Sequence, residues 1–333
     1  MEIVNTEFVR HQLQERREKL QEAIPLTKNA DPLLSLLKEV DTALEKIAKG
    51  TYGICETCHD SIEAERLVVD PFIRNCLDHL TRSEQQTLER DLDLAYEVQK
   101  NLLPKQGLRV HGWETAYHYA PAGSVSGDYC DLIDVGRQTS TDPAGDCLYF
   151  LIGDVAGKGV AASILMAHLH AVFRSLVHAK HPFERLMDEA NRLFCEGALS
   201  THFATLVCGR ANAKGEVELS NAGHVPPFIV RAAAVEKIPP TGIPLGMFCN
   251  SGYTARSFSL GKGESLVLYT DGVTETKSPD GTFYGEENLT KLIGSAPAHA
   301  AHELVAACVD ELKTHRGGGA KTDDVTIMAI KRV

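Results

Sequence analysis

Apolar residues recur at helical spacing over the first 50 positions of the chain. One set follows a four-and-three spacing through Val9, Leu13, Arg16, Leu20 and Ala23. A second set follows it through Leu33, Leu37, Val40, Leu44 and Ile47. Between the two sets, Asp31 suits the N-cap of a helix and Pro32 suits its first position. The pattern predicts a hairpin of two antiparallel helices over residues 1–49, although two amphipathic helices lying on another domain would fit it as well.

A third helical pattern covers residues 82–103, and Pro104 ends it. Its apolar seam runs through Leu88, Leu92, Ala95, Gln99 and Leu102. About three heptads are available, which allows a coiled coil in which Gln99 sets the register. The alternative is a linker helix packed on the domain that follows. Both readings make residues 82–107 a connecting segment.

From about residue 108 the pattern changes to short apolar runs that are typical of strands. These runs cover residues 148–152, 203–207, 227–230, 265–269 and 325–330. Helical spacing covers residues 161–177, 183–199 and 300–314. Strands, then two helices, then further strands predict a layered α+β domain over residues 108–333.

Composition and charge narrow the class of protein. The 333 residues carry a net charge of −11, which argues against a general nucleic-acid or anionic-membrane binder. The first residues lack a signal-peptide pattern, and no run approaches the roughly 18 apolar residues of a membrane span. Six of the nine cysteines lie singly, at Cys130, Cys147, Cys195, Cys208, Cys249 and Cys308. Buried, reduced thiols in a cytoplasmic protein are the simplest expectation.

Three other cysteines and a histidine have metal-ligand spacing. Cys55, Cys58, Cys76 and His79 form the pattern C-x2-C-x17-C-x2-H. Two close pairs separated by a short loop suit tetrahedral Zn²⁺, and four protein ligands leave no open position for catalysis. The pattern predicts a structural zinc site over residues 50–81, with a coincidence of free thiols as the alternative.

This region resembles the DksA/TraR family of zinc-finger proteins over residues 33–80. The resemblance rests on residues 43–47, on Gly50-Thr51-Tyr52-Gly53 and on the two ligand pairs. His79 stands where the family usually has a fourth cysteine. Family members that act on RNA polymerase carry a long hairpin with an acidic tip, whereas this hairpin is short and offers chiefly Asp31. The resemblance therefore gives little support to polymerase binding.

Four short acidic segments occur in this domain, and three of them place an Asp at the end or the start of an apolar run. They contain Gly127-Asp128, Gly153-Asp154, Asp271-Gly272 and Asp323-Asp324. Carboxylates from several strand ends can converge on one spot, where Mg²⁺ or Mn²⁺ would find its preferred oxygen ligands. Each segment alone could be a turn or a solvated loop. Together they predict a metal-dependent hydrolase of phosphoesters.

The chain from about residue 92 to residue 333 resembles the SpoIIE/RsbU branch of the PPM metal-dependent Ser/Thr protein phosphatases. The matching motifs, in order, are Gln99–Pro104, Ser126–Tyr129, Gly153–Val155 with Gly157-Lys158-Gly159, Asn221–His224, Pro244–Gly246, Leu268–Glu275 and Thr322–Thr326. The resemblance implies a β-sandwich of two antiparallel sheets flanked by helices. It also implies a site for two Mn²⁺ or Mg²⁺ ions at one end of the sandwich.

The resemblance also implies roles for single residues. Asp128 and Asp154 should ligate metal, with Asp154 bridging both ions and the Val155 carbonyl completing one coordination shell. Asp271 and either Asp323 or Asp324 should complete the other shell, and Asp323 is favoured. Two further residues have supporting roles: Asp131 would act through water or by positioning, and His224 would fix a loop rather than serve as the general acid.

These features predict a cytoplasmic protein-serine/threonine phosphatase that uses a metal-activated water. The resemblance implies a phosphorylated regulatory protein as the substrate, such as an anti-sigma-factor antagonist of a partner-switching system. The N-terminal zinc-finger module would regulate the enzyme, and the linker helix would form a homodimer. A different hypothesis is a transcription-associated zinc-finger binding protein with an inactive phosphatase domain. No membrane partner is expected.

Overall fold

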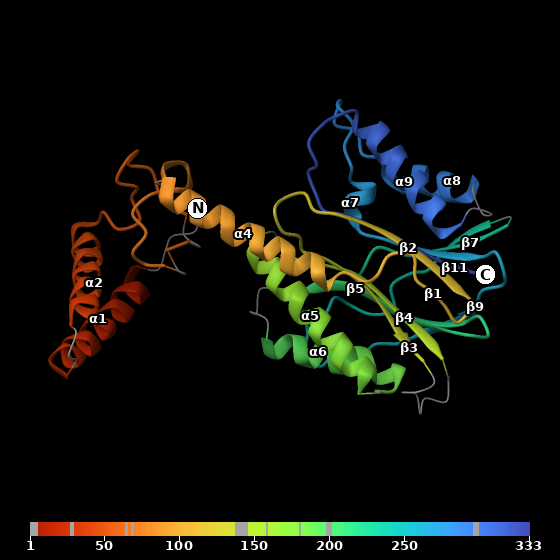
Figure 1. The fold of residues 1–333 in the computed structure, drawn as a ribbon, viewed down its shortest axis with the longest axis horizontal. Coiled ribbons are helices and arrows are strands. Elements are labelled where there is room, and N and C mark those ends of the chain that lie inside the picture. The colour runs from red at the N-terminus through yellow and green to blue at the C-terminus, as the bar shows by residue number, and fades with distance from the viewer. Residues whose placement is uncertain are drawn as a thin grey trace. The chain divides into compact units, whose positions relative to one another are not determined.

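The computed structural model describes most of the chain, in two compact units. The described residues are 6–26, 30–63, 66–67, 70–80, 82–136, 146–157, 159–179, 181–197, 202–232, 234–295 and 300–333. The units are Met1–Arg90 and Asp91–Val333 (Figure 1). Helix α4 (Arg82–Leu102) continues across the division between them.

In the N-terminal unit, helices α1 (Thr6–Ala23) and α2 (Asp31–Lys49) pack on each other, with a short 3-10 helix, η1 (Ile24–Leu26), after α1. Their shared core contains Val9, Leu13, Leu20, Val40, Ala43 and Ile47. The expected N-cap at Asp31 is wrong by one position, because Ala30 is the N-cap and Asp31 lies in the first turn. Gly50 ends α2 in the left-handed conformation with φ of 68°, which glycine adopts at little cost. Residues 27–29 of the predicted hairpin loop lie outside the described residues.

The second unit contains two antiparallel sheets. One sheet has the order β1 (Arg109–Val110), β2 (Trp113–Ala120), β11 (Val325–Arg332), β10 (Ser265–Tyr269), β7 (Phe228–Arg231) and β8 (Ala234–Lys237). The other has the order β3 (Asp128–Val135), β4 (Cys147–Val155), β5 (Ala204–Asn212), β6 (Glu216–Ala222) and β9 (Arg256–Ser259). Every paired strand within them is antiparallel. The predicted pair of antiparallel sheets is confirmed.

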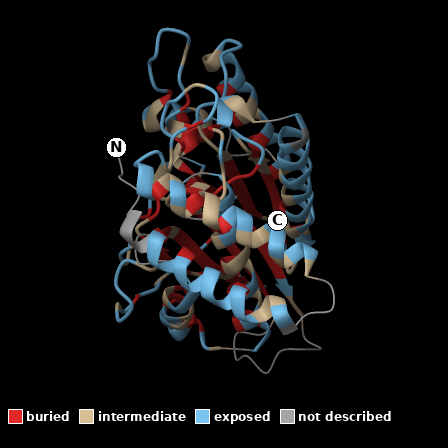
Figure 2. Ribbon diagram, turned by 90° about the vertical axis from the view of Figure 1, so that its left-hand side faces the viewer, coloured by how far each residue is buried: buried red, intermediate tan, exposed pale blue. Residues whose placement is uncertain are grey.

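The two sheets face each other and helices cover their outer faces. Along β4, Leu148, Phe150 and Ile152 point into the layer between the sheets, while Tyr149 and Leu151 pack under helices. Helices α5 (Val160–His178) and α6 (Phe183–Gly197) cover the sheet that contains β4 (Figure 1). Helices α8 (Gly285–Ser295) and α9 (Ala301–Arg316) cover the other sheet, and α7 (Asp271–Thr274) follows β10. The strands lie in the buried interior while the outer helix faces are exposed (Figure 2).

Helix α5 differs from the expectation that no segment could span a membrane. By length and composition alone it is apolar enough to cross a bilayer, and 44% of its most apolar 18-residue stretch is buried inside the structure. Its buried side chains include Met166, Leu169 and Phe173, which pack in the same core as Tyr149 and Leu151 of β4. In this fold α5 therefore uses its apolar residues as a core helix.

The second half of α4 packs on the rest of the second unit through the helix face that contains Gln99. Gln99 is 4% exposed, and Leu92, Ala95 and Leu102 are partly buried. Leu94 and Val98, on another face, are 65% and 53% exposed. For residues 91–102 the structure therefore shows a helix packed on the following domain, which was the alternative to a coiled-coil seam at these positions.

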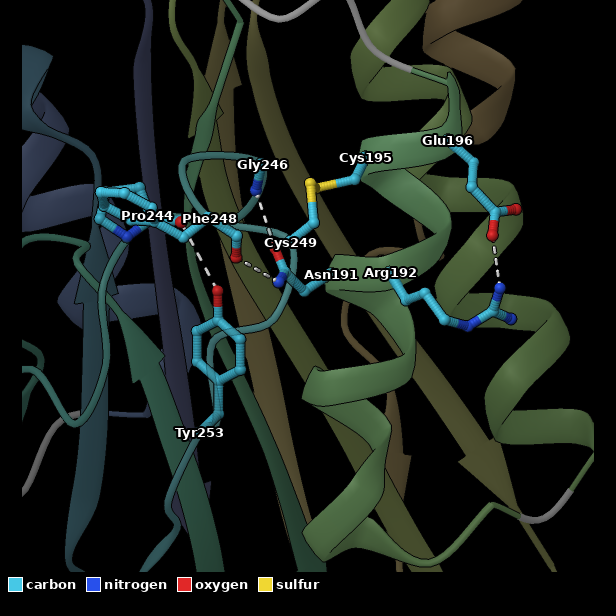
Figure 3. The surroundings of a disulfide bond; sticks show 9 residues. All are labelled: Asn191, Arg192, Cys195, Glu196, Pro244, Gly246, Phe248, Cys249 and Tyr253. Atoms are coloured by element: carbon cyan, nitrogen blue, oxygen red, sulfur yellow. Dashed lines mark hydrogen bonds and ion pairs between the residues drawn. A yellow bond between two sulfur atoms is a disulfide. The ribbon is translucent and has the colours of Figure 1, made fainter.

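One pair of cysteines contradicts the expectation of reduced thiols. Cys195, near the end of α6, forms a disulfide with Cys249 in the loop that precedes β9 (Figure 3). Asn191 on α6 also holds this loop, because its side chain accepts a hydrogen bond from Gly246 N at 2.8 Å and donates one to Phe248 O at 2.9 Å. The other four single cysteines are buried thiols outside the disulfide, as expected. Packing of α6 against the loop brings together two cysteines that are 54 positions apart in sequence.

We expect alkylation of the denatured, unreduced protein to label seven of its nine cysteines, and alkylation after reduction to label all nine. Reduction should lower the free energy of unfolding of the second unit by roughly 2–4 kcal/mol, because the cross-link restricts the unfolded chain. Intact mass and urea unfolding measure the two effects. Labelling of all nine cysteines without a reductant would exclude the disulfide.

Candidate functional site

Two of the predicted carboxylates lie opposite each other in one sheet. Asp128 begins β3, Asp154 lies near the end of β4, and the two residues are register partners. Directly paired residues of antiparallel strands place their side chains on the same face. Cys130 and Ile152, two positions along each strand, lie in the core between the sheets. Asp128 and Asp154 therefore face the other sheet at one end of the sandwich.

The other sheet supplies two hydroxyl groups to Asp128. Thr270, just after β10, donates from Oγ1 to Asp128 Oδ2 at 2.9 Å, and Thr326 of β11 donates from Oγ1 to the same oxygen at 2.5 Å. Thr326 N in turn donates to Thr270 Oγ1 at 3.0 Å. The sequence motifs include both threonines, but neither was assigned a role. Their positions, beside Asp271 and two residues after Asp324, are the signal that could have identified them.

Glycines allow the acidic segments to approach closely. A Cβ atom on Gly127 would lie 3.0 Å from Val155 O and 3.3 Å from Asp154 Oδ1. A Cβ atom on Gly272 would lie 1.9 Å from Asp324 O. The segment of Asp128 thus adjoins that of Asp154, and the segment of Asp271 adjoins that of Asp323 and Asp324. All four predicted segments meet at this end of the sandwich.

Asp323 and Asp324 have different surroundings. Asp324 Oδ1 accepts a hydrogen bond from Ala122 N at 2.7 Å, and its Oδ2 accepts one from Gly127 N at 3.0 Å. Both carboxylate oxygens of Asp324 therefore hold the loop between β2 and β3 in place. Asp323 Oδ1 accepts a hydrogen bond from Asp324 N at 3.1 Å.

The electrostatics of this end favour a bound cation. Asp128 is 2% exposed, and burial together with the charges of Asp154 and Asp324 raises its pKa well above the usual range. Hydrogen bonds from Thr326 and Thr270 act in the opposite direction. An added positive charge would relieve the cost of gathering carboxylates in a buried place, and their oxygens suit hard divalent ions. These residues therefore fit the Mn²⁺ or Mg²⁺ that the sequence predicts, although among the described residues they form no group of three ligand atoms within 4.8 Å of one another.

Asp131 lies away from this centre. It is fully buried and accepts two hydrogen bonds from Arg174 of α5, at 2.9 Å from Nε and 2.8 Å from Nη2. Its carboxylate thus links β3 to α5 through Arg174. The structure therefore supports the positioning role of Asp131 and not the role through metal-bound water. Lys158, in the third motif, lies outside the described residues.

The second predicted metal site lies in the N-terminal unit. Ligand atoms of Cys55, Cys58, Cys76 and His79 all lie within 4.8 Å of one another. Cys76 Sγ lies 3.2 Å from His79 Nδ1 in η2 (Leu77–His79) and 3.7 Å from Cys58 Sγ. Burial would raise the pKa of the Cys55 thiol, but backbone N–H groups of Cys58, Cys76 and Thr57 lower it to about 6. Three sulfurs and one imidazole, with one thiol poised to ionise, fit tetrahedral Zn²⁺.

Comparison with known protein families identifies both parts of the chain. The family model of stage II sporulation protein E, SpoIIE, matches residues 144–333, more than half of the sequence. The chain belongs to the SpoIIE family. The model of the prokaryotic dksA/traR C4-type zinc finger matches residues 50–85. The predicted zinc-finger resemblance and the predicted PPM phosphatase domain are both confirmed.

The alignments of this SpoIIE-family chain with curated relatives cover most of its length. It is 29% identical to protein IcfG of Synechocystis over 271 residues, covering 73% of this chain and 41% of IcfG. It is 26% identical to phosphoserine phosphatase RsbU of Bacillus subtilis over 260 residues, covering 77% of this chain and 74% of RsbU. The chain thus spans about two fifths of one curated relative and about three quarters of the other.

A solved structure shows the same fold as the SpoIIE-family unit. The SiaA-PP2C domain of Pseudomonas aeruginosa superposes with a TM-score of 0.63 at 16% identity, covering 76% of this chain and 99% of that domain. This likeness confirms the predicted phosphatase fold of two sheets with flanking helices.

His224 joins the two sheets behind the acidic segments of the SpoIIE-family unit. It is 3% exposed, and its Nε2 donates to Tyr269 O at 3.0 Å because a carbonyl can only accept. Its Nδ1 then accepts from Thr205 Oγ1 at 2.8 Å. Thr205 is the register partner of Asp154, and Tyr269 precedes Thr270. His224 is a neutral, buried histidine that fixes the backbone near the site, in agreement with its expected role.

Burial lowers the pKa of His224 to about 4 in the folded protein. The unfolded chain binds this proton below the ordinary histidine pKa of about 6.5. The neutral native form therefore stabilises the fold fully above that value, and the contribution is lost as the pH falls through the window down to about 4. Between pH 7 and pH 5 the wild type should lose about 2 kcal/mol of unfolding free energy through this group.

Urea unfolding of His224→Gln at the two pH values should show this pH-dependent loss of stability removed. The same pH dependence in wild type and His224→Gln would contradict the assignment.

Proposed function

We propose that this chain is a metal-dependent protein-serine/threonine phosphatase. The observation that carries the proposal is the meeting of four acidic segments from both sheets around the buried carboxylate of Asp128, which lies opposite Asp154. The curated relative RsbU is named a phosphoserine phosphatase, and this name supports the same chemistry here. The SpoIIE family match and the likeness to the SiaA-PP2C domain support the fold in which this chemistry would take place.

The proposed ligands of two Mn²⁺ or Mg²⁺ ions are Asp128, Asp154, the carbonyl of Val155, Asp271 and Asp323. When bound, such ions neutralise phosphate charge and lower the pKa of an attacking water. Thr270 and Thr326 orient the Asp128 carboxylate, and His224 holds the backbone beside Asp154 and Thr270. Asp324 anchors a loop with both carboxylate oxygens, which supports Asp323 over Asp324 as the ligand.

The proposed substrate is a phosphorylated regulatory protein, such as an anti-sigma-factor antagonist of a partner-switching system. The N-terminal parts, a helical hairpin at 1–49 and a zinc finger at 50–81, would regulate the catalytic domain at 108–333 through the linker at 82–107. Zinc bound by Cys55, Cys58, Cys76 and His79 would be structural. All four acidic segments are intact, which supports an active enzyme over a binding protein with an idle phosphatase domain.

Asp154→Asn should reduce Mn²⁺-dependent hydrolysis of a phosphoserine protein or a generic phosphoester by at least about a hundredfold, since it removes the charge of a residue that would hold the ions. Its circular dichroism should match that of the wild type. Cys58→Ser is the matched control: it should lose the one zinc per chain measured by elemental analysis, yet keep turnover of the generic phosphoester. Wild-type activity in Asp154→Asn would exclude the metal assignment, and no activity in the wild type with any divalent metal would favour the binding protein.

We also propose a homodimer through the linker helix. Leu94 and Val98 of α4 and Ile164 of α5 are exposed by 65%, 53% and 62%. They border one apolar groove between the two helices, which also contains Ala95 and Leu102. Apolar side chains gathered in this way favour burial against another surface, and a second copy of the helix is the proposed occupant.

Leu94→Asp should convert the dimer to monomer in sedimentation experiments, because burying a carboxylate in an apolar contact is costly. Phe283→Asp, at a residue exposed by 52% outside α4 and α5, should leave the dimer intact. A wild-type protein that sediments as a monomer at micromolar concentration would overturn the dimer.

A further inference from the structure

A pocket with a volume of about 110 Å³ lies between the C-terminal half of α9 and strands β2 and β11. Its cationic side chains are Lys313 and Arg316, from the last turn of α9, and Lys321, from the loop that follows. None of the described residues that line this pocket is acidic. In a chain with a net charge of −11, a local group of cations without carboxylates favours an anionic ligand.

Basic side chains at the end of a helix also have a structural explanation, because they interact favourably with the helix dipole. Lys313 fits this explanation, and it also forms an ion pair with Asp310 of the same helix at 3.0 Å. Arg316 differs, because its Nε is buried and has no hydrogen-bond partner among the described residues. A buried donor without an acceptor is costly. An anion in the pocket would give this guanidinium the acceptor that the described residues do not supply.

Lys321 adds a second charge without a carboxylate partner among the described residues. Its Nζ donates to Pro121 O at 3.4 Å. Burial and the positive charges of Lys321 and Lys313 lower the pKa of His118, which lines the pocket from β2. His118 is therefore neutral at pH 7, and Arg316 and Lys321 supply the charge that an anion would meet.

This pocket adjoins the proposed metal site. Arg316 and Lys321 also line a second, smaller pocket, and the wall of that pocket includes Asp323 and Gly272. The two cations thus lie next to a proposed metal ligand. Consecutive residues of an extended peptide are only about 3.3 Å apart. A peptide whose phosphoserine reaches the metal site can therefore bring a neighbouring side chain to Arg316 and Lys321.

We propose that Arg316 and Lys321 form an anion-binding pocket that recognises an acidic side chain close to the phosphoserine of the substrate protein. This inference rests on the proposed function and narrows the substrate class to phosphoserine segments that carry aspartate or glutamate near the target residue. A guanidinium can pair with a carboxylate through two parallel N–H groups, and Lys321 would add a point charge. The carboxylates of the metal site repel an acidic segment, and these two cations would offset that repulsion.

The test measures hydrolysis of two phosphoserine peptides by the full-length protein with Mn²⁺. One peptide carries glutamate at the two positions on each side of the phosphoserine, and the other carries glutamine there. For the wild type, kcat/KM should be about tenfold higher for the glutamate peptide, chiefly through a lower KM, as one charge-assisted pairing would give. In Arg316→Gln this preference should fall to about twofold or less, because the main partner of the carboxylate is lost.

Arg192→Gln is the matched control and should keep the wild-type preference. Arg192 is a helical arginine of α6, but its guanidinium already pairs with Glu189 and Glu196. Lys321→Gln provides a second variant if Arg316→Gln does not fold, and it should reduce the preference in the same direction.

Equal kcat/KM for the two peptides in the wild type would overturn the anion pocket, as would the full preference in either folded variant or an equal loss in Arg192→Gln. Inhibition by inorganic phosphate separates the other source of an anion. If the pocket held released phosphate instead, Arg316→Gln would weaken this inhibition and leave the peptide preference unchanged, which would also overturn the proposal. A wild-type protein that hydrolyses neither peptide with Mn²⁺ would instead overturn the proposed function, so the two failures are distinguishable.

Discussion

The buried carboxylate of Asp128 is the group around which the proposed metal site of the second unit is organised. It begins a strand of one sheet, faces Asp154 of the same sheet, and accepts two hydroxyl hydrogen bonds from the other sheet. Burial and neighbouring negative charges make its ionised form costly, while the hydroxyls stabilise that form. A bound cation would offset this unfavourable energy, because its positive charge compensates the buried negative charges, and this compensation would favour binding of the ion.

The neighbouring polar residues divide into those that face this centre and those that hold the scaffold around it. Asp131 fastens α5 through Arg174, Asp324 seats a loop, and His224 joins the sheets. Each is buried or paired, and each joins segments that are far apart in sequence. Such contacts explain how short acidic segments spread over about 200 residues come to lie at one place, since the antiparallel register fixes one pair and side-chain hydrogen bonds fix the rest.

The sequence predicts strands best where both faces are buried. Strands β4 and β10 are continuous apolar runs and were predicted, whereas β2 and β3 were not, because polar residues such as Glu114, Asp128 and Asp131 interrupt their patterns. Those polar residues are satisfied by partners in other elements, which no local pattern reveals. The acidic segments and the zinc ligands were visible as motifs. Three other features depend on contacts between residues 27 to 54 positions apart, and spacing alone could not identify them. They are the ion pair of Asp131 with Arg174, the hydrogen bonds of Gln99 to Ser126, and the disulfide of Cys195 with Cys249.

The proposed function requires carboxylates from both sheets to hold paired divalent ions at one end of the sandwich. Anomalous X-ray scattering at the manganese absorption edge, from crystals of the full-length protein grown with Mn²⁺, locates such ions directly. We expect two neighbouring peaks in contact with Asp128, Asp154, Asp271 and Asp323. Manganese peaks elsewhere on the molecule, with none among these four residues at saturating Mn²⁺, would contradict it.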